Sequence, residues 1–269
     1  MLSSFQVAAL QMVSSSLLDD NLYQAEKLIR EAAESGCQLV SLPEYFCFMG
    51  HKDRDKLALK ESDGNGKIQN FLHQISKKYA IWIIAGTLPI ETDDPNRIYN
   101  SLLVYGPDGQ RITRYDKIHL FSFSKGAESY NEAISIQPGK PEPHVFEAPF
   151  GRVGVAVCYD LRFPELFRAM GDIQLLVIPS AFTYTTGQAH WEILLRARAI
   201  ENQCYVLAPA QGGKHENGRR TWGHSMLITP WGEVQNVLGE GPGCVSGVLD
   251  LDYLRQIREN LPALAHRVM

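Results

Sequence analysis

Three side chains with reactive chemistry each follow an apolar, strand-like stretch. Cys158 ends the run GRVGVAVC, Glu44 ends LVSLPE and Lys117 ends ITRYDK. An ordinary thiol has a pKa of about 8.5 and needs a base or a positive neighbour to become a nucleophile at neutral pH. Each residue alone also fits a structural role: a core cysteine, a helix cap and a solvated strand end. Their shared position favours one site, because open α/β sheets build sites at the carboxyl ends of their strands.

Together the three groups can carry out acyl transfer. No partner histidine is evident for the thiol of Cys158, so we expect Glu44 to accept its proton. The ammonium group of Lys117 would stabilise the oxyanion of a tetrahedral intermediate, and the backbone N–H of Tyr159 would supply a second donor.

Other familiar chemistries lack their motifs. The sequence contains no G-x-S-x-G, no H-E-x-x-H and no phosphate-binding P-loop. Its eight histidines form no close group with the spacing of metal ligands. We therefore expect no metal and no cofactor, and we interpret His119 and His224 as hydrogen-bonded structural residues.

Composition narrows the class of protein. With 269 residues, of which 45% are hydrophobic, the chain can bury a sizeable core as one domain spanning residues 1–269. The net charge of −4 offers no basic surface for nucleic acid. We expect no signal peptide, because the start MLSSFQVAALQMVSSS lacks a basic region followed by an adequate apolar stretch. We expect no membrane span, since no apolar run approaches roughly 18 residues. The odd number of cysteines, never spaced as C-x-x-C, favours reduced thiols in the cytoplasm. They are Cys37, Cys47, Cys158, Cys204 and Cys244.

Strand-like and helix-like segments alternate, with hairpins between them. This pattern predicts an α/β fold with mixed sheets. Strands are expected at 5–12, 37–44, 81–90, 173–182 and 204–211, a hairpin at 99–117, and a final β-meander at 224–251. Helices are expected at 20–35, 67–80, 189–203 and 253–264.

The segments LPEYF, RYDKIHLF and GVAVCYDLRFPEL resemble the three signature segments of the nitrilase, or carbon–nitrogen hydrolase, superfamily. The likeness extends over essentially the whole chain. It implies a four-layer α-β-β-α sandwich, a Glu-Lys-Cys catalytic triad at Glu44, Lys117 and Cys158, no metal, and a homodimer or larger assembly. The superfamily also has a second glutamate between the lysine and cysteine motifs. Glu132 matches it by its place before SIQPG, and Glu128 is the rival.

Within the superfamily, residues 179–215 and 223–232 are similar to a branch of small-acid amidases. The likeness is greatest to the deaminated-glutathione amidases and next to the ω-amidases. Met49 stands where the ω-amidases tend to carry tyrosine. The resemblance implies an amide at the end of a 2-oxoglutarate-type chain that bears an α-keto carboxylate.

Two residues are candidates for binding that carboxylate. Arg162, one turn past the nucleophile, can offer a planar guanidinium fork. A buried ion pair with Asp160 or Glu165 would explain the same residue. Thr186, in the expected loop TYTTG, can donate a hydroxyl, although its neighbours are ordinary loop residues.

Other functions remain as alternatives. A nitrilase or a carbamoylase would use the same three residues. A thiol redox sensor would need a resolving cysteine near Cys158, and none lies close in the sequence. An inactive scaffold would not need the intact set of reactive groups.

Overall fold

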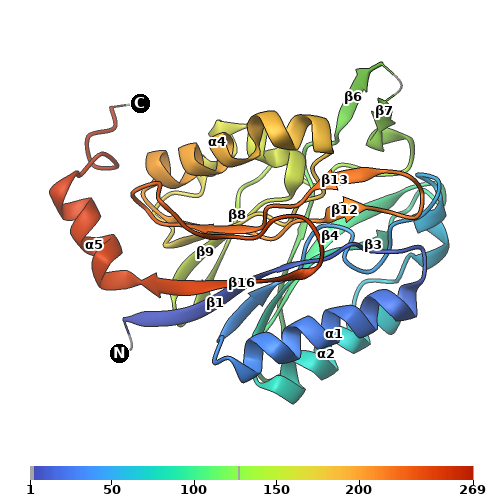
Figure 1. Cartoon of the computed structure of the whole chain (residues 1–269), viewed down its shortest axis with the longest axis horizontal. Helices are drawn as coiled ribbons and strands as arrows, with labels where there is room; N and C mark the ends of the chain where they lie inside the picture. The colour runs from blue at the N-terminus through green and yellow to red at the C-terminus, as the bar shows by residue number, and fades with distance from the viewer. Residues whose placement is uncertain (1–2, 127, 269) are drawn as a thin grey trace.

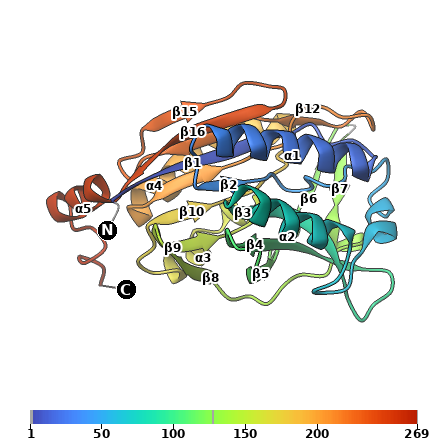
Figure 2. The same cartoon turned by 90° about the horizontal axis from the view of Figure 1, so that it is seen from below.

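The computed structural model describes residues 3–126 and 128–268. Within them, two six-stranded sheets pack face to face (Figures 1 and 2). The first contains, in spatial order, β16 (Gly243–Asp250), β1 (Ser4–Gln11), β2 (Leu39–Ser41), β3 (Trp82–Glu91), β4 (Ile98–Tyr105) and β5 (Arg111–Asp116). The second contains β15 (Val234–Val237), β14 (Met226–Ile228), β11 (Tyr205–Ala208), β10 (Leu175–Val177), β9 (Gly151–Val155) and β8 (His144–Ala148).

Helices cover the outer face of each sheet. Helices α1 (Leu18–Glu34) and α2 (Lys67–Tyr79) lie on the first sheet, and α3 (Pro164–Ala169) and α4 (Tyr184–Asn202) lie on the second (Figures 1 and 2). The predicted four-layer α-β-β-α sandwich is therefore confirmed. Helix α5 (Leu251–Asn260) follows at one end of the molecule. None of the described helices combines the length and apolarity that crossing a membrane requires.

Alternating side chains explain how one strand serves two apolar layers. In β1, Phe5, Val7 and Ala9 belong to the core between the sheets, whereas Ala8 and Leu10 belong to the core beneath α1 and α2. Successive residues of a strand point to opposite faces, so a strand buried on both sides must be apolar throughout.

Two expectations about elements are wrong. The segment 224–251 is not one meander, because β14 and β15 lie in the second sheet while β16 crosses to the first and pairs with β1. Val245 and Leu249 of β16 enter the core between the sheets, which accounts for the crossing. Helix α4 begins at Tyr184 instead of residue 189, because Thr183 caps its first turn by accepting the N–H of Thr186.

Short elements complete the described chain. They are the hairpins β6 (Ser122–Lys125) with β7 (Glu128–Asn131) and β12 (Gly212–Lys214) with β13 (Arg220–Trp222), and the single turns η1 (Asp55–Leu59), η2 (Glu132–Ile134) and η3 (Cys158–Arg162). All five cysteines are free thiols.

Candidate active site

The segment after β2 carries Glu44 in a tight turn. Tyr45 adopts a positive φ of 58°, and its N–H donates to the hydroxyl of Thr87 at 2.9 Å. The turn packs directly against β3 at Gly86, where a Cβ atom would lie 1.8 Å from the carbonyl oxygen of Pro43. Only glycine permits this approach, so Gly86 fixes where the carboxylate of Glu44 lies.

Lys117 follows β5 and is fully buried. Its Nζ lies 2.9 Å from Oε1 of Glu44 and 2.8 Å from Oε2 of Glu132. Asn100 of β4 donates its side-chain N–H to the same Oε1 of Glu44 at 3.0 Å, and its carbonyl accepts the N–H of Lys117 at 3.1 Å. Among the described residues, both hydrogen bonds to the carboxylate of Glu44 end on Oε1, which leaves Oε2 for another partner.

Glu132 lies at the start of η2 and contacts the same ammonium group. In addition to Lys117, it accepts the backbone N–H of Phe121 at 2.8 Å and the hydroxyl of Tyr45 at 2.8 Å. The structure therefore places Glu132 beside the lysine. The side chain of the rival, Glu128, lies outside the described part of the chain.

The charges of this cluster stabilise one another. Burial by itself would lower the pKa of Lys117, but the carboxylates of Glu132 and Glu44 raise that pKa above its usual range. Although burial opposes it, the Lys117 ammonium holds the pKa of Glu132 below its ordinary value. Lys117 consequently remains an ammonium group, suited to stabilising negative charge and unsuited to accepting a proton.

Cys158 is the first residue of η3, and its backbone is strained. It has a positive φ of 50°, and its N–H donates to the carbonyl of Pro179 at 3.0 Å. Burial and the nearby charge of Glu44 raise the pKa of the thiol, while Lys117 and the backbone N–H of Ala181 act in the opposite direction. The resting thiol is therefore protonated and needs a base before it can attack.

A buried aspartate holds this turn in place. Asp160 accepts the N–H of Val157 at 2.8 Å, the hydroxyl of Tyr115 at 2.7 Å and the N–H of His119 at 3.0 Å. Tyr115 belongs to β5, the strand that precedes Lys117 in the first sheet. The hydrogen bonds of Asp160 therefore connect that strand to the turn of Cys158, which follows β9 of the second sheet. Cys158 and Lys117 are thereby fixed relative to each other.

Both histidines that the sequence left without a catalytic role are hydrogen-bonded. Nδ1 of His119 lies 2.7 Å from Oδ1 of Asp160, and Nδ1 of His224 lies 2.8 Å from the carbonyl oxygen of Trp222. The prediction that both are hydrogen-bonded is confirmed, and their structural role stays a prediction.

The side chains of Glu44, Glu132 and Cys158 meet in a cavity that we call the inner cavity. It is lined by Glu44, Phe121, Glu132, Cys158, Tyr159, Arg162, Ala181, Phe182, Thr183, Thr186 and Arg219. Its volume of about 10 Å³ is enough for roughly one water molecule, so a substrate must displace some of these side chains. The cavity lies between the two sheets. Our expectation of a site at the edge of one open sheet is wrong, because Glu44 and Lys117 follow strands of the first sheet and Cys158 follows β9 of the second.

Arg162 borders the inner cavity without an ion pair to either expected carboxylate. Its Nη1 lies 3.2 Å from Nδ1 of His190 in α4, and its guanidinium lies 5.5 Å from the ring centroid of Phe182. The carboxylate of Asp160 is occupied by other donors. The guanidinium is thus available to an anion in the cavity.

Thr186 also borders the inner cavity, but from the first turn of α4 and not from a loop. Its hydroxyl lies 2.9 Å from the hydroxyl of Thr183. In this pair one hydroxyl donates its hydrogen and the other accepts it. The accepting hydroxyl can therefore still donate its own hydrogen toward the cavity.

Sequence reasoning missed several residues of the site. Tyr45 and Asn100 complete the hydrogen bonds of the two glutamates, and Asp160 holds the cysteine turn. A signal existed for Asn100, which with Ser101 forms a polar pair in the otherwise mainly apolar strand YNSLLVY. None existed for Arg219, which lies in a polar loop.

The arrangement provides the parts of a covalent acyl-transfer reaction. A protonated thiol and a carboxylate with a free oxygen border one cavity, and the permanent ammonium group of Lys117 contacts the two glutamates that line it. The amide of Tyr159 lies at the start of η3, where the first N–H groups of a helical turn lack a carbonyl partner within it.

The comparisons agree with this chemistry. A family model described as carbon–nitrogen hydrolase matches residues 6–259. The chain is 40% identical over 269 residues to the deaminated glutathione amidase of Synechocystis, covering 98% of both chains. It is 38% identical to omega-amidase NIT2-A of Xenopus laevis, covering 99% of this chain and 96% of that one. The crystal structure of the C. elegans NitFhit protein superimposes with a TM-score of 0.92 at 37% identity, covering 99% of this chain and 65% of that longer one.

Proposed function

The chain belongs to the carbon–nitrogen hydrolase family, and from this premise we propose that it hydrolyses the amide of deaminated glutathione through a thioester on Cys158. The products are 2-oxoglutarate and cysteinylglycine, and the reaction repairs a deaminated metabolite. The observation that carries the chemistry is the buried Glu44–Lys117–Glu132 cluster on the same cavity as Cys158.

The first half of the reaction forms the thioester. Glu44 removes the proton from the thiol, and the sulfur attacks the amide carbonyl carbon. The developing oxyanion accepts hydrogen bonds from Nζ of Lys117 and the N–H of Tyr159. Glu44 then returns the proton to the amide nitrogen as the C–N bond breaks and the amine leaves. Glu132 takes no proton, because its part is to hold Lys117 in position.

The second half releases the acid. With the amine gone, a water molecule enters beside Glu44, which removes its proton as the oxygen attacks the thioester carbonyl. The same two donors stabilise the second oxyanion. Cleavage of the C–S bond, with a proton returned to the sulfur by Glu44, restores the thiol of Cys158.

Two residues of the inner cavity support an α-keto carboxylate as the acyl part of the substrate. Arg162 borders it with a guanidinium that no described carboxylate neutralises, and Thr186 offers a hydroxyl nearby. An α-keto carboxylate fits both, because a guanidinium matches the two oxygens of a carboxylate.

A second candidate is ω-amidase activity on α-ketoglutaramate, which shares the same acyl group. The 38% identity to omega-amidase NIT2-A supports it almost as strongly as the 40% identity supports the first. The two candidates differ in the amine that leaves: a dipeptide in one and ammonia in the other.

We also propose a cytoplasmic homodimer. Three large apolar side chains lie exposed on and beside α4: Ile193 at 71%, Ile200 at 51% and Trp231 at 54%. A second copy would cover this apolar patch in a symmetric pair. Five free cysteines suit a reducing compartment.

The test is a panel of substrates assayed for 2-oxoglutarate and free amine. We expect the highest kcat/KM with deaminated glutathione, a lower value with α-ketoglutaramate, and no turnover of simple nitriles. If a nitrile or an N-carbamoyl amino acid gives a higher kcat/KM than both keto-amides, the proposed function is wrong.

A further inference from the structure

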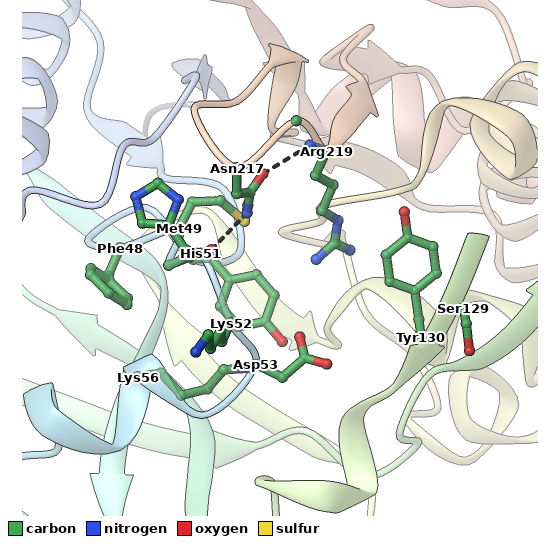
Figure 3. Close-up of a pocket in the computed structure, with 13 residues that line it drawn as sticks. Phe48, Met49, His51, Lys52, Asp53, Lys56, Ser129, Tyr130, Asn217 and Arg219 are labelled. Carbon is green, nitrogen blue, oxygen red and sulfur yellow. Dashed lines mark hydrogen bonds between the residues drawn. The ribbon is translucent and has the colours of Figure 1, made fainter. Parts of the chain in front are cut away.

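A second, larger cavity adjoins the active site, and we call it the outer cavity. It has a volume of about 400 Å³ and lies between residues 45–56, the β6–β7 hairpin and the loop that precedes β13 (Figure 3). Arg219 lines both cavities. The outer cavity is therefore the space next to the reacting groups into which the rest of a substrate can extend.

Positive charge dominates the wall of the outer cavity. Lys52, Lys56 and Arg219 line it, against the single carboxylate of Asp53. Among the described residues, no carboxylate lies within 4 Å of Nζ of Lys56, which rests 4.9 Å from the ring centroid of Tyr45. Burial lowers the pKa of Lys56, although the charges of Glu132 and Asp53 act in the opposite direction.

Arg219 carries a buried donor without an acceptor. Its Nε is one of two buried side-chain polar atoms in the described chain that make no hydrogen bond. Buried donors are rarely left unpaired, so this one points to an acceptor supplied by a ligand. Figure 3 shows the guanidinium extending into the cavity between Asn217 and Tyr130, and its carbon lies 4.9 Å from the centroid of the Tyr130 ring.

The loop that carries Arg219 is hydrogen-bonded to the wall of the outer cavity formed by residues 45–56. Asn217 accepts the N–H of Arg219 at 2.9 Å and donates its own side-chain N–H to the carbonyl of Gly50 at 2.6 Å. The guanidinium therefore projects from a fixed backbone, which suits the recognition of a particular ligand group.

We propose that the outer cavity binds the amine part of the amide, and that Arg219 and Lys56 together bind a carboxylate on it. This inference rests on the proposed function, in which Cys158 attacks an amide in the inner cavity. A dipeptide spans at most about 7 Å when extended. Arg219 also lines the inner cavity, which contains Cys158. It therefore lies at the end of the outer cavity nearest the nucleophile, within reach of the carboxylate of a dipeptide.

The consequence is selectivity for the leaving group. An amide of cysteinylglycine brings a carboxylate to Arg219 and Lys56, whereas a primary amide releases ammonia and leaves both cations without an anion. The outer cavity thus favours deaminated glutathione over α-ketoglutaramate, although the two substrates share one acyl group.

The experiment compares two amides with the same 2-oxoglutaryl group, one of cysteinylglycine and one of cysteinylglycinamide, which lacks the carboxylate. The readout is the ratio of their kcat/KM values in the wild type, Lys56→Met and Arg219→Gln. The matched controls are Lys214→Met and Arg220→Gln, which change an exposed lysine and an exposed arginine that do not line the cavity.

We expect each cavity variant to reduce the ratio by about tenfold or more, equivalent to about 1.4 kcal/mol. The controls should change it by less than twofold. Lys56 also lies near Glu132, so it has an alternative role in positioning that carboxylate. That role would lower both kcat/KM values equally, and an unchanged ratio overturns the proposal.

A second measurement separates this inference from the proposed function. Free S-methylcysteinylglycine, whose blocked thiol cannot consume iodoacetamide, should slow the alkylation of Cys158 in the wild type more than S-methylcysteinylglycinamide does, and the difference should disappear in both cavity variants. Protection without hydrolysis of either keto-amide would uphold the outer cavity and reject the function. Equal protection by the two dipeptides would reject the carboxylate site even if deaminated glutathione is hydrolysed.

Discussion

At the scale of residues, the site balances one ammonium group against two carboxylates. Lys117 contacts both Glu44 and Glu132, and a thiolate beside them would add a further negative charge. Burial, together with this surplus of negative charge, raises the pKa of Cys158 and keeps the resting thiol protonated. In the proposed mechanism Glu44 is therefore the base, even though its charge disfavours the thiolate.

The substitution Glu44→Gln separates these two effects of the carboxylate. Hydrolysis should slow by roughly two to four orders of magnitude in kcat, because the base is lost. The charge that raises the pKa of the Cys158 thiol is lost as well, so the pKa falls and the pH profile of alkylation by iodoacetamide moves to lower pH. Alkylation of the variant followed by mass spectrometry measures this shift.

The control for that experiment is Glu165→Gln, which removes an exposed carboxylate of α3. It should alter neither the rate nor the alkylation profile. Activity of Glu44→Gln within a few-fold of the wild type would assign the base to Glu132 or to water.

The second prediction for a single residue concerns Arg162. Arg162→Lys keeps the charge but removes the planar fork, so KM for keto-amides should rise by roughly tenfold and kcat should fall less. Steady-state kinetics measures both constants. A fall in kcat with an unchanged KM would mean that Arg162 does not bind the acyl carboxylate in the ground state.

At the scale of elements, three segments that follow strands of two different sheets must be positioned accurately relative to one another. The turn of Glu44 packs against β3, Lys117 follows the edge strand β5, and Cys158 begins η3 after β9. Gly86 and Asp160 are the contacts that set these positions, one through close approach and the other through hydrogen bonds.

Gly86→Ala should misplace the turn of Glu44 without touching the reactive groups. The new methyl group would overlap the carbonyl of Pro43, and a displacement of about 1 Å is enough to lower kcat/KM roughly a hundredfold. The control is Gly239→Ala, since a Cβ atom there meets nothing within 4 Å. Equal kinetics for the two variants, measured with the same folded fraction by circular dichroism, would contradict this role for Gly86.

Many of the helices and strands could be predicted from the sequence, because their formation depends on local patterns of apolar residues. The apolar spacing of α1 and the apolar runs of β1 and β3 indicated elements that the structure contains. The start of α4 was missed because Thr183 caps a turn of the polar segment TYTTG, which also suits a loop. The polar side chain of Asn100 in a mainly apolar strand was a signal that the sequence analysis did not use, whereas Arg219 could not be assigned to the site, since only tertiary packing brings it there.

At the scale of the whole molecule, the second sheet is necessary to the chemistry. Each sheet alone carries an incomplete set of groups, and the core between them brings the sets together. The sequence did not predict that β16 returns to the first sheet, because pairing between distant strands depends on packing and not on local periodicity. Our prediction of a single domain over residues 1–269 stays a prediction.

The apolar patch formed by Ile193, Ile200 and Trp231 predicts the oligomeric state. Light scattering after size exclusion should give twice 30.2 kDa or more for the wild type. Ile193→Asp should shift it toward the monomer, because a charge would be buried in the interface. Leu17→Asp, an exposed site at the start of α1, should leave the dimer intact. A monomeric wild type at micromolar concentration would contradict the assignment.

The central claim is that Cys158 forms a thioester with the acyl part of its amide substrate. Its most direct test is mass spectrometry of the intact enzyme, quenched in acid during turnover of deaminated glutathione and then digested. We predict one 2-oxoglutaryl group on the peptide that contains Cys158, and neither adduct nor turnover in a folded Cys158→Ala protein. Continued hydrolysis by Cys158→Ala, or turnover of the wild type with the acyl group on another residue, would contradict the account.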